Sequence, residues 1–181
     1  MMMDKESAIV AVIDVQARLL AGVHENEQLV RNCSWLVRLA SLMGVPVIGS
    51  EQYPDGVGHT EESLRELVGV DNIYGKTFFS CIDDPEFEKA FQDHGRKQVV
   101  LCGMESQACV MQSVLRLLEK GLDVFVVADA ISARNPFDTD IALRRMEQAG
   151  ARIVTREMVG FEWLRRSDAP EFKTFSKEFL R

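Results

Sequence analysis

Short apolar runs alternate along this chain with segments of helical periodicity, and this alternation restricts the possible folds more than any other feature of the sequence. The runs are continuous, as is typical of strands that are buried on both faces of a sheet. Strands that alternate with helices at this spacing predict a parallel sheet with helices on both faces, a three-layer α/β/α architecture. Strands are predicted at residues 8–13, 45–48, 72–74, 99–102, 123–127 and 152–154, and helices at 26–43, 61–67, 85–94, 107–120, 138–149, 157–164 and 170–180.

The stretch 98–120 shows this alternation most clearly. Its apolar run at 99–102 predicts a strand, and after Gly103 the apolar residues recur at helical spacing. Cys109 is therefore predicted in the first turn of a helix, with Ser106 as the candidate N-cap. Unpaired N–H groups and the positive end of the helix dipole lie in that turn, and both favour a thiolate. Cys109 is a candidate nucleophile.

The composition indicates a single domain spanning residues 1–181. The chain has 181 residues, of which 46% are hydrophobic, so it is long enough and apolar enough to bury a full core. A formal net charge of −7, without a cluster of Lys or Arg, argues against a nucleic-acid partner or an anionic membrane. No apolar run approaches the roughly 20 residues of a membrane span. Because the first residues also lack a signal-peptide pattern, a cytoplasmic location is predicted.

The chain has four cysteines and no CxxC spacing. This number is small for the length, so neither a zinc site nor a disulfide framework is predicted. Apart from Cys109, the cysteines are predicted to be buried structural residues, namely Cys33, Cys81 and Cys102.

Polar side chains stand at the ends of several predicted strands. Asp14 follows the first strand, Lys76 the third, Cys109 the fourth and Asp129 the fifth. Because the carboxyl ends of parallel strands meet at one edge of the sheet, we expect residues at these ends to converge. The turn-rich segment 51–60 follows the second strand, and loops of this length in compact domains are often binding loops. It is predicted to form part of the rim of a site.

The chain contains Val-Ile-Asp-Val-Gln at 12–16, Gly-Lys-Thr-Phe-Phe-Ser at 75–80 and Cys-Gly-Met-Glu-Ser-Gln-Ala-Cys-Val at 102–110. In this order the three motifs resemble the isochorismatase-like cysteine hydrolases, a family that includes nicotinamidases and carbamoyl-amide hydrolases. The resemblance covers nearly the whole chain, and the tail is similar to that of eukaryote-type isochorismatase-domain proteins. Together with the alternating pattern it predicts six parallel strands in the order 3-2-1-4-5-6.

The resemblance implies a catalytic triad in which Cys109 is the nucleophile, Asp14 its proton acceptor, and Lys76 a cation that holds the aspartate and the site together. The implied reaction is hydrolysis of a C–N bond in a small amide or carbamoyl compound, through a thioester on Cys109. Backbone N–H groups of Glu105 and Cys109 would hold the oxyanion. The peptide bond between Met104 and Glu105, in the turn before the cysteine, is expected to be cis.

Other residues near these motifs are predicted to line the substrate pocket. For Asp129 the alternative is that its carboxylate orients the following loop through hydrogen bonds to backbone N–H groups. The predicted substrate-binding residues are Gln52, Tyr53, Phe78, Asp129 and Arg134.

The sequence departs from the nicotinamidase pattern in the segment after the second strand. Nicotinamidases carry an aspartate and two histidines there as metal ligands, whereas this chain reads Glu51-Gln52-Tyr53-Pro54 with His59 alone. No metal and no other cofactor are therefore expected, and His59 is interpreted as a loop histidine. Isochorismatases proper lack the cysteine, so Cys109 favours the amidase-like branch of the family.

Two other functional classes stay open. The chain could be a catalytically silent binding or scaffold protein that retains the fold and the triad. It could also be a doubly wound nucleotide-binding domain, but neither GxGxxG nor GxxxxGK[ST] follows the first strand. An aromatic stripe near the C-terminus indicates either core packing or a subunit contact, and a homo-oligomer, a dimer or larger, is expected; the stripe is Phe172, Phe175 and Phe179.

Overall fold

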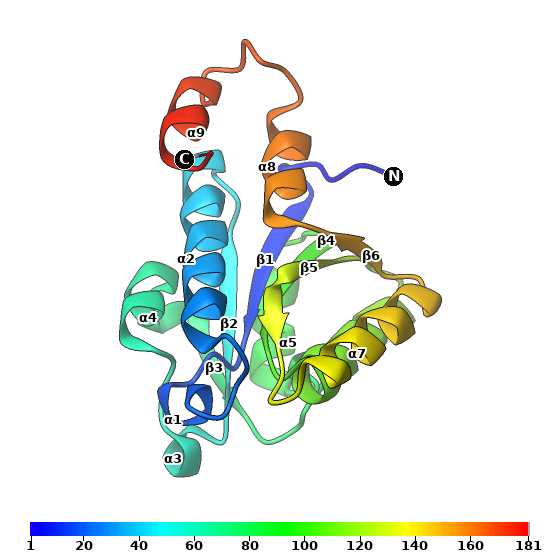
Figure 1. Cartoon of the computed structure of the whole chain (residues 1–181). Helices are drawn as coiled ribbons and strands as arrows, with labels where there is room; N and C mark the ends of the chain where they lie inside the picture. The colour runs from blue at the N-terminus through cyan, green and yellow to red at the C-terminus, as the bar shows by residue number, and fades with distance from the viewer. Residues whose placement is uncertain (181) are drawn as a thin grey trace.

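The computed structural model describes residues 1–180 of the chain. In this part of the chain six strands form one parallel sheet in the order β3-β2-β1-β4-β5-β6, which confirms the predicted topology (Figure 1). The strands are β1 Ala8–Ile13, β2 Val47–Gln52, β3 Ile73–Lys76, β4 Gln98–Met104, β5 Asp123–Ser132 and β6 Arg152–Val154.

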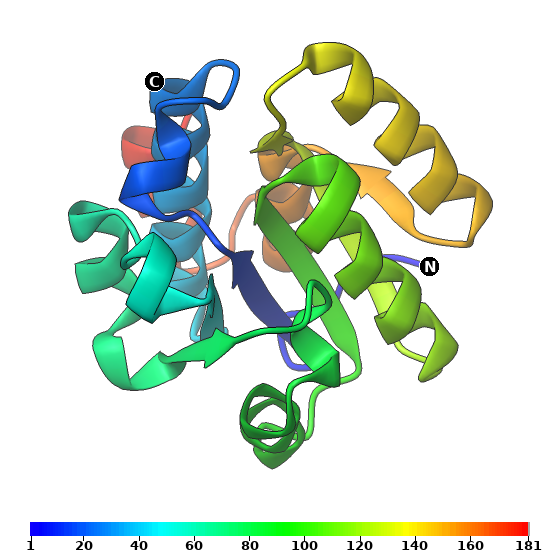
Figure 2. The ribbon, with the colours of Figure 1, turned by 90° about the horizontal axis from the view of Figure 1, so that it is seen from below.

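Helices cover both faces of the sheet (Figures 1 and 2). The α-helices are α1 Ala17–Leu20, α2 Asn26–Met43, α3 Pro54–Val57, α4 Glu62–Val68, α5 Pro85–Asp93, α6 Met111–Glu119, α7 Pro136–Gln148, α8 Arg156–Leu164 and α9 Phe172–Glu178. Shorter helical turns are η1 Val70–Asn72, η2 Cys81–Asp83 and η3 Ser106–Val110.

The central strand β1 shows why the apolar runs are continuous. Val10 and Val12 belong to the core that is shared with α2, α8 and α9. Ile9 and Ile13 point to the opposite core, which is shared with α5, α6 and α7. Every residue of β1 is buried, because successive side chains enter different helix layers.

Four strands are longer than the sequence indicates. β3 continues to Lys76, and β4 continues through Gly103, which pairs with Ile13, to Met104. β2 continues to Gln52 because it pairs with β3 up to the register Gln52↔Lys76. β5 continues to Ser132, since it resumes pairing with β4 after an irregularity in register. Asp129 therefore lies within a strand, not beyond its carboxyl end as predicted. The segment 51–60 is also not entirely loop, because it contains the end of β2 and the helix α3.

The aromatic stripe near the C-terminus mainly serves the core. Phe175 and Phe179 are buried, and their rings contact Trp35 of α2 with centroids 6.3 and 5.2 Å away. The indole N–H of Trp35 also donates a hydrogen bond to the carbonyl oxygen of Phe179 (3.1 Å). The stripe thus fixes α9 on α2.

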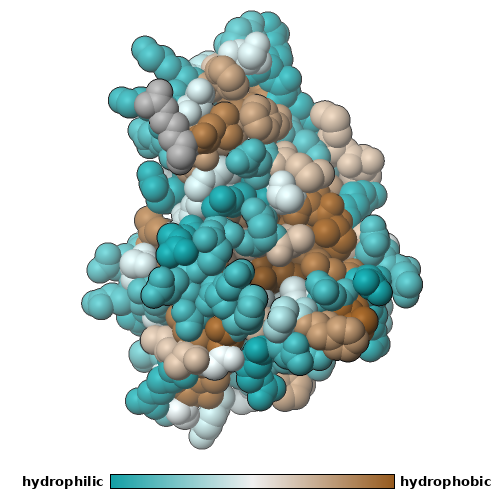
Figure 3. All heavy atoms as spheres, in the orientation of Figure 1, coloured by the Kyte–Doolittle hydropathy of each residue, from teal (hydrophilic) through white to brown (hydrophobic). Residues whose placement is uncertain are grey.

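The surface mixes polar and apolar side chains. Figure 3 shows apolar side chains gathered on the right of the view, between the positions of α8 and α7 in Figure 1. Within residues 1–180, no helix combines the length and the apolar character that crossing a membrane requires.

Candidate active site

The carboxyl edge of the sheet, seen in Figure 2, brings together three residues that are distant in sequence. Asp14 directly follows β1, Lys76 ends β3, and Cys109 lies in η3 after β4. The strand pairing accounts for this convergence. β1 lies between β2 and β4, and β2 carries β3 on its other side.

A buried ion pair joins Asp14 to Lys76. The ammonium nitrogen Nζ of Lys76 lies 2.7 Å from Asp14 Oδ2, and the two side chains are only 0% and 2% exposed. The other carboxylate oxygen of Asp14 accepts a hydrogen bond from the hydroxyl of Ser50 (2.7 Å). Asp14 adopts a left-handed backbone conformation (φ 52°), and its backbone N–H donates to the carbonyl oxygen of Ser50 (3.0 Å). Both the backbone and the side chain of Asp14 are therefore held by the end of β2.

Lys76 donates three hydrogen bonds. Its acceptors are Asp14 Oδ2 at 2.7 Å, Gln52 Oε1 at 2.6 Å and the carbonyl oxygen of Phe78 at 3.0 Å. An ammonium group has three N–H donors. All three therefore have an acceptor within the protein.

Cys109 lies in a π-helical turn that continues into α6. Its Sγ is 3.8 Å from Gln52 Oε1, with the thiol as donor, and the residue is 7% exposed. The N-cap of the turn is Glu105, not Ser106 as predicted. Ser106 is fully buried and accepts a hydrogen bond from the hydroxyl of Thr139 in α7 (3.2 Å), so it is a packing residue rather than a cap.

Cys109 is not poised as a thiolate in the free protein, which corrects the sequence-based expectation. Burial raises the pKa of the Cys109 thiol to about 12, the charge and hydrogen bonding of Asp14 raise it as well, and those of Lys76 lower it. Burial and the carboxylate together outweigh the effect of the lysine on this pKa. At neutral pH the resting group is the thiol, and its proton must be removed when the sulfur reacts.

The turn before Cys109 contains the cis peptide bond between Met104 and Glu105 that the resemblance implies. The carboxylate of Glu105 is 3.2 Å from Nε of Arg134, and it also accepts a hydrogen bond from the side-chain amide of Gln107 (2.7 Å). Arg134, predicted to bind substrate, thus lies beside the turn, with its side chain 68% exposed.

The other predicted substrate-binding residues fall into two groups. The side chains of Tyr53 and Phe78 are about half exposed. Tyr53 follows Gln52 in the chain, and the carbonyl oxygen of Phe78 binds Lys76. Asp129 is not brought to this site by its side chain. Its carboxylate accepts a hydrogen bond from the backbone N–H of Arg156 (2.9 Å) and pairs with the guanidinium of that residue, so it anchors the start of α8. It does bond to a backbone N–H group, but not to one in the following loop.

Gln16 and Ser50 have structural roles at the site that the sequence did not predict. Ser50 binds the carboxylate of Asp14, as described above. The side-chain amide of Gln16 donates to the carbonyl oxygens of Gln52 (3.0 Å) and Gly58 (2.6 Å), and its oxygen accepts from the backbone N–H of Gln52 (2.7 Å). Gln16 is fully buried and belongs to the first motif. Its place in that motif, two residues after Asp14, is the sequence feature that could have indicated its role at the site.

His59 is engaged by Glu51 and is not part of a metal cluster. Nδ1 of His59 lies 2.9 Å from the Glu51 carboxylate, which also accepts hydrogen bonds from the N–H and hydroxyl of Thr60. Burial alone would raise the pKa of Glu51, but the hydrogen bonds from Thr60 and His59 outweigh it and lower the pKa. Among residues 1–180, no three His, Cys, Asp or Glu side chains are grouped closely enough to hold a metal ion.

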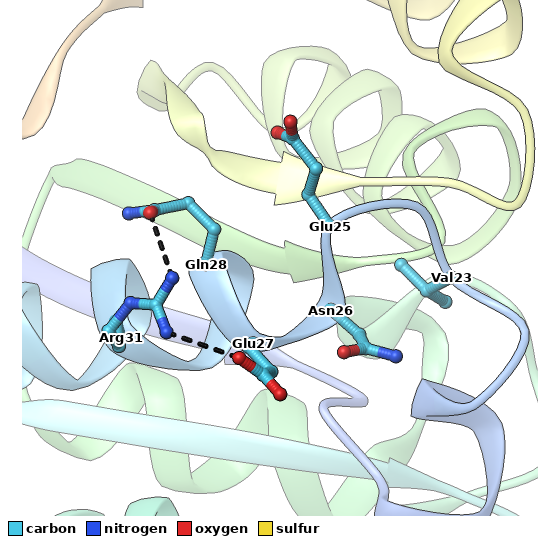
Figure 4. Close-up of a pocket in the computed structure, with 6 residues that line it drawn as sticks. All are labelled: Val23, Glu25, Asn26, Glu27, Gln28 and Arg31. Atoms are coloured by element: carbon cyan, nitrogen blue, oxygen red, sulfur yellow. Dashed lines mark hydrogen bonds and ion pairs between the residues drawn. The ribbon is translucent and has the colours of Figure 1, made fainter.

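A separate hollow of about 400 Å³ lies at the start of α2 (Figure 4). Arg31 in this hollow contacts the carboxylate of Glu27 at 3.5 Å and donates a hydrogen bond to the side chain of Gln28 at 3.1 Å. None of the predicted site residues lines it, so it is not the candidate site. The lining residues are Val23, Glu25, Asn26, Glu27, Gln28 and Arg31.

Comparison with known proteins gives consistent matches. A family model described as the isochorismatase domain matches residues 7–158. Isochorismatase domain-containing protein 2A of Mus musculus is 36% identical over 173 residues, which cover 95% of this chain and 82% of that protein.

Solved structures match over nearly the whole chain. MAR1 ribonuclease from Caenorhabditis elegans has a TM-score of 0.92 at 33% identity, covering 100% of this chain and 93% of the other. The ycaC gene product of Escherichia coli, described as an octameric hydrolase of unknown specificity, has a TM-score of 0.90 at 31% identity, with 99% and 91% covered. YcaC from Pseudomonas aeruginosa, solved with hexane-2,5-diol and covalent acrylamide, has a TM-score of 0.90 at 31% identity, with 97% and 90% covered.

Proposed function

This chain belongs to the isochorismatase domain family, and from that premise we propose that it is a cysteine-dependent hydrolase that cleaves the C–N bond of a small amide or carbamoyl compound. The observation that carries the proposal is the buried Asp14–Lys76 ion pair acting on the thiol of Cys109. Burying an ion pair is costly, and removing one partner of a buried pair is costly too. The perturbed pKa of the Cys109 thiol beside this pair is of the kind that clusters at functional sites.

In the first half of the reaction the sulfur of Cys109 attacks the substrate carbonyl carbon. Asp14 accepts the thiol proton as the C–S bond forms, since the free thiol is neutral, and then passes that proton to the leaving amine. Expulsion of the amine breaks the C–N bond and leaves a thioester on Cys109. Backbone N–H groups of Glu105 and Cys109 stabilise the oxyanion of the tetrahedral intermediate.

In the second half a water molecule attacks the thioester carbon. Asp14, again a carboxylate, accepts a proton from the water, and the C–S bond breaks as the carboxylic or carbamic acid leaves. The proton returns to the sulfur, which restores the resting thiol. Lys76 holds the side chain of Asp14 in place between the two halves through their 2.7 Å contact.

The rim residues define the class of substrate in this proposal. Tyr53 and Phe78 offer half-exposed aromatic surface. Arg134 pairs with Glu105 through Nε and its side chain is 68% exposed, so we infer that its other N–H groups bind a polar or anionic substituent of the substrate. Such a site fits a small molecule with a planar amide and a modest apolar part.

A covalent adduct in a similar protein supports a reactive nucleophile. YcaC from Pseudomonas aeruginosa was solved with covalent acrylamide, and acrylamide is an electrophile that adds to thiolates. In this chain, Cys109 is the cysteine that lies on the shared carboxyl edge beside an acid–base pair. The octameric description of the Escherichia coli protein likewise supports our expectation of a homo-oligomer.

Ribonuclease activity is a weaker candidate, despite the name of the Caenorhabditis elegans protein. The formal net charge of −7 disfavours binding to a phosphate backbone. A silent scaffold is also less well supported, because a buried ion pair beside a buried thiol is expensive to keep without a chemical use.

The test is a hydrolysis screen with the wild type and two variants. Small amides, ureas, carbamoyl compounds and a single-stranded RNA are incubated with wild type, Cys109→Ala and Cys33→Ala, and ammonia, amine or RNA fragments are measured. Cys33 is a matched control because it is fully buried in α2, and its thiol bonds to the carbonyl oxygen of Ala130. We expect a small C–N substrate to be hydrolysed by wild type and Cys33→Ala but not by Cys109→Ala. Hydrolysis that survives in Cys109→Ala, or RNA cleavage without amide hydrolysis, would refute the proposal.

A further inference from the structure

We propose that Gln52 is a positioning residue, whose side-chain oxygen occupies a Lys76 N–H donor that would otherwise stabilise the Cys109 thiolate. The importance of this role rests on the proposed function, whereas the contacts described below do not depend on it. Gln52 was predicted from the sequence to touch substrate. Its side chain also makes hydrogen bonds with Lys76, Cys109 and the carbonyl oxygen of Thr77.

The amide oxygen of Gln52 lies between the lysine and the cysteine. It accepts a hydrogen bond from Lys76 Nζ at 2.6 Å, and the thiol of Cys109 points to it from 3.8 Å. An amide oxygen has two lone pairs, so one acceptor can serve both donors. Gln52 therefore contacts both the cation and the nucleophile through a single oxygen atom.

This bond determines what the ammonium of Lys76 can do. The three donors of Lys76 are taken by Asp14, Gln52 and the carbonyl oxygen of Phe78. The lysine lowers the pKa of Cys109 by its charge and by hydrogen bonding, yet that pKa remains about 12. Because Gln52 takes up one of the three donors, its oxygen competes with a sulfur anion for hydrogen bonds from the ammonium.

Gln52 is itself held in place by several contacts. Its side-chain nitrogen donates to the carbonyl oxygen of Thr77 (3.0 Å), which fixes the orientation of the amide. Its backbone N–H and carbonyl are both bound by the buried side chain of Gln16. A residue that only lined a substrate pocket would not need its backbone and both ends of its amide fixed by the protein. The arrangement is that of a support for Lys76 and Cys109.

The test compares two variants with opposite expected effects on Cys109. Gln52→Leu keeps the bulk of the side chain but removes the acceptor, so a donor of Lys76 becomes available to the sulfur and the thiolate is stabilised. Gln52→Glu keeps an acceptor in the same place and adds a negative charge, which disfavours the thiolate. The charged groups that act on the sulfur are otherwise Asp14 and Lys76.

The readout is the rate at which iodoacetamide alkylates Cys109 at pH values from 7 to about 11, followed by mass spectrometry of the Cys109 peptide, because the thiolate is the reacting form. We expect the pH profile of Gln52→Leu to move down and that of Gln52→Glu to move up, each by about one unit, or about tenfold in rate at fixed pH. Gln92→Leu in α5, where the glutamine contacts Glu88 on the surface, is the control and should match wild type.

The proposal requires shifts of opposite sign. Unchanged profiles, or shifts of the same sign, would overturn it, because a purely structural role affects both variants through stability alone. Circular dichroism confirms folding, and if Gln52→Leu does not fold, the direction of the Gln52→Glu shift decides. The assay needs no substrate. Failure here with hydrolysis still lost in Cys109→Ala would reject the role of Gln52 alone, and surviving hydrolysis in Cys109→Ala would reject the proposed function instead.

Discussion

Replacing Lys76 with methionine tests how much the buried ion pair contributes to the free energy of unfolding. The side chains of Lys76 and Asp14 are 0% and 2% exposed, and their charged atoms are 2.7 Å apart. Methionine retains most of the length and volume of lysine, so the substitution removes the charge and the three donors without opening a large cavity. The carboxylate of Asp14 would then be left buried beside the hydroxyl of Ser50 but without a cation.

The expected loss of stability follows from that unpaired carboxylate. Removing one partner of a buried ion pair typically costs about 3–5 kcal/mol, because the other charge stays in a medium that solvates it poorly. For a protein of this size each kcal/mol corresponds to roughly 2–4 °C in Tm, so Lys76→Met should melt about 6–20 °C lower. Replacing the carboxylate as well, in the double variant with Asp14→Asn, should recover at least about half of the loss, since no charge is then left unpaired.

The assay is urea denaturation of wild type, both single variants and the double variant, combined as a double-mutant cycle. Lys89→Met is the matched control, because Lys89 is exposed on α5 and its replacement should change stability by no more than about 0.5 kcal/mol. The reasoning would be refuted if Lys76→Met cost no more than Lys89→Met. It would also be refuted if the two single effects added without recovery in the double variant.

Two further outcomes are expected. Asp14→Asn removes the carboxylate that raises the pKa of Cys109, so alkylation of Cys109 near pH 8 should become faster while hydrolysis is lost; alkylation slower than in wild type would contradict this. Gly103→Ala should fail to fold or lose more than about 4 kcal/mol, because at φ +125° its Cβ would lie 2.1 Å from the carbonyl oxygen of Ile13. Gly121→Ala is the control, since its φ is +79° but nothing lies within 4 Å of its Cβ, and urea midpoints that are equal for the two variants would exclude the clash as the cause.

The sheet was predictable because its signals are local and repeated. Each strand is an apolar run in which alternate side chains enter different helix layers, as in β1, so the run itself reports burial on both faces. The strand order came from the motifs as well as from the alternation. What the sequence did not reveal was where pairing ends. β2 and β5 continue into polar residues because a neighbouring strand offers partners there, as at Gln52↔Lys76, and this is a tertiary effect.

The sequence predicted which side chains converge at the carboxyl edge of the sheet, but it did not predict the protonation of the thiol among them. Asp14, Lys76 and Cys109 could be placed together from strand ends, but the protonation state of the thiol depends on burial and on the balance between two opposite charges. Neither is visible in the sequence near Cys109. A helix N-terminus favours a thiolate, but burial of the sulfur raises the pKa of the Cys109 thiol. Asp129 failed as a strand-end residue for a related reason, since β5 extends beyond it and its carboxylate binds the start of α8.

A thiol that is neutral at rest has a consequence for the proposed reaction. A preformed thiolate would attack any electrophile that reached it, whereas a thiol with a pKa of about 12 reacts only when a base accepts its proton at the moment of attack. In the proposed reaction Asp14 is that base, and its almost completely buried carboxylate lies 2.7 Å from the ammonium of Lys76. Bond formation and proton transfer therefore depend on one another, and they require a carbonyl carbon to be positioned above the sulfur with its leaving nitrogen near the carboxylate. Selectivity for the correct substrate then arises from geometry at the carboxyl edge of the sheet, which is fixed by the backbone of β1 and β2 and by Gln16, rather than from the intrinsic reactivity of the cysteine.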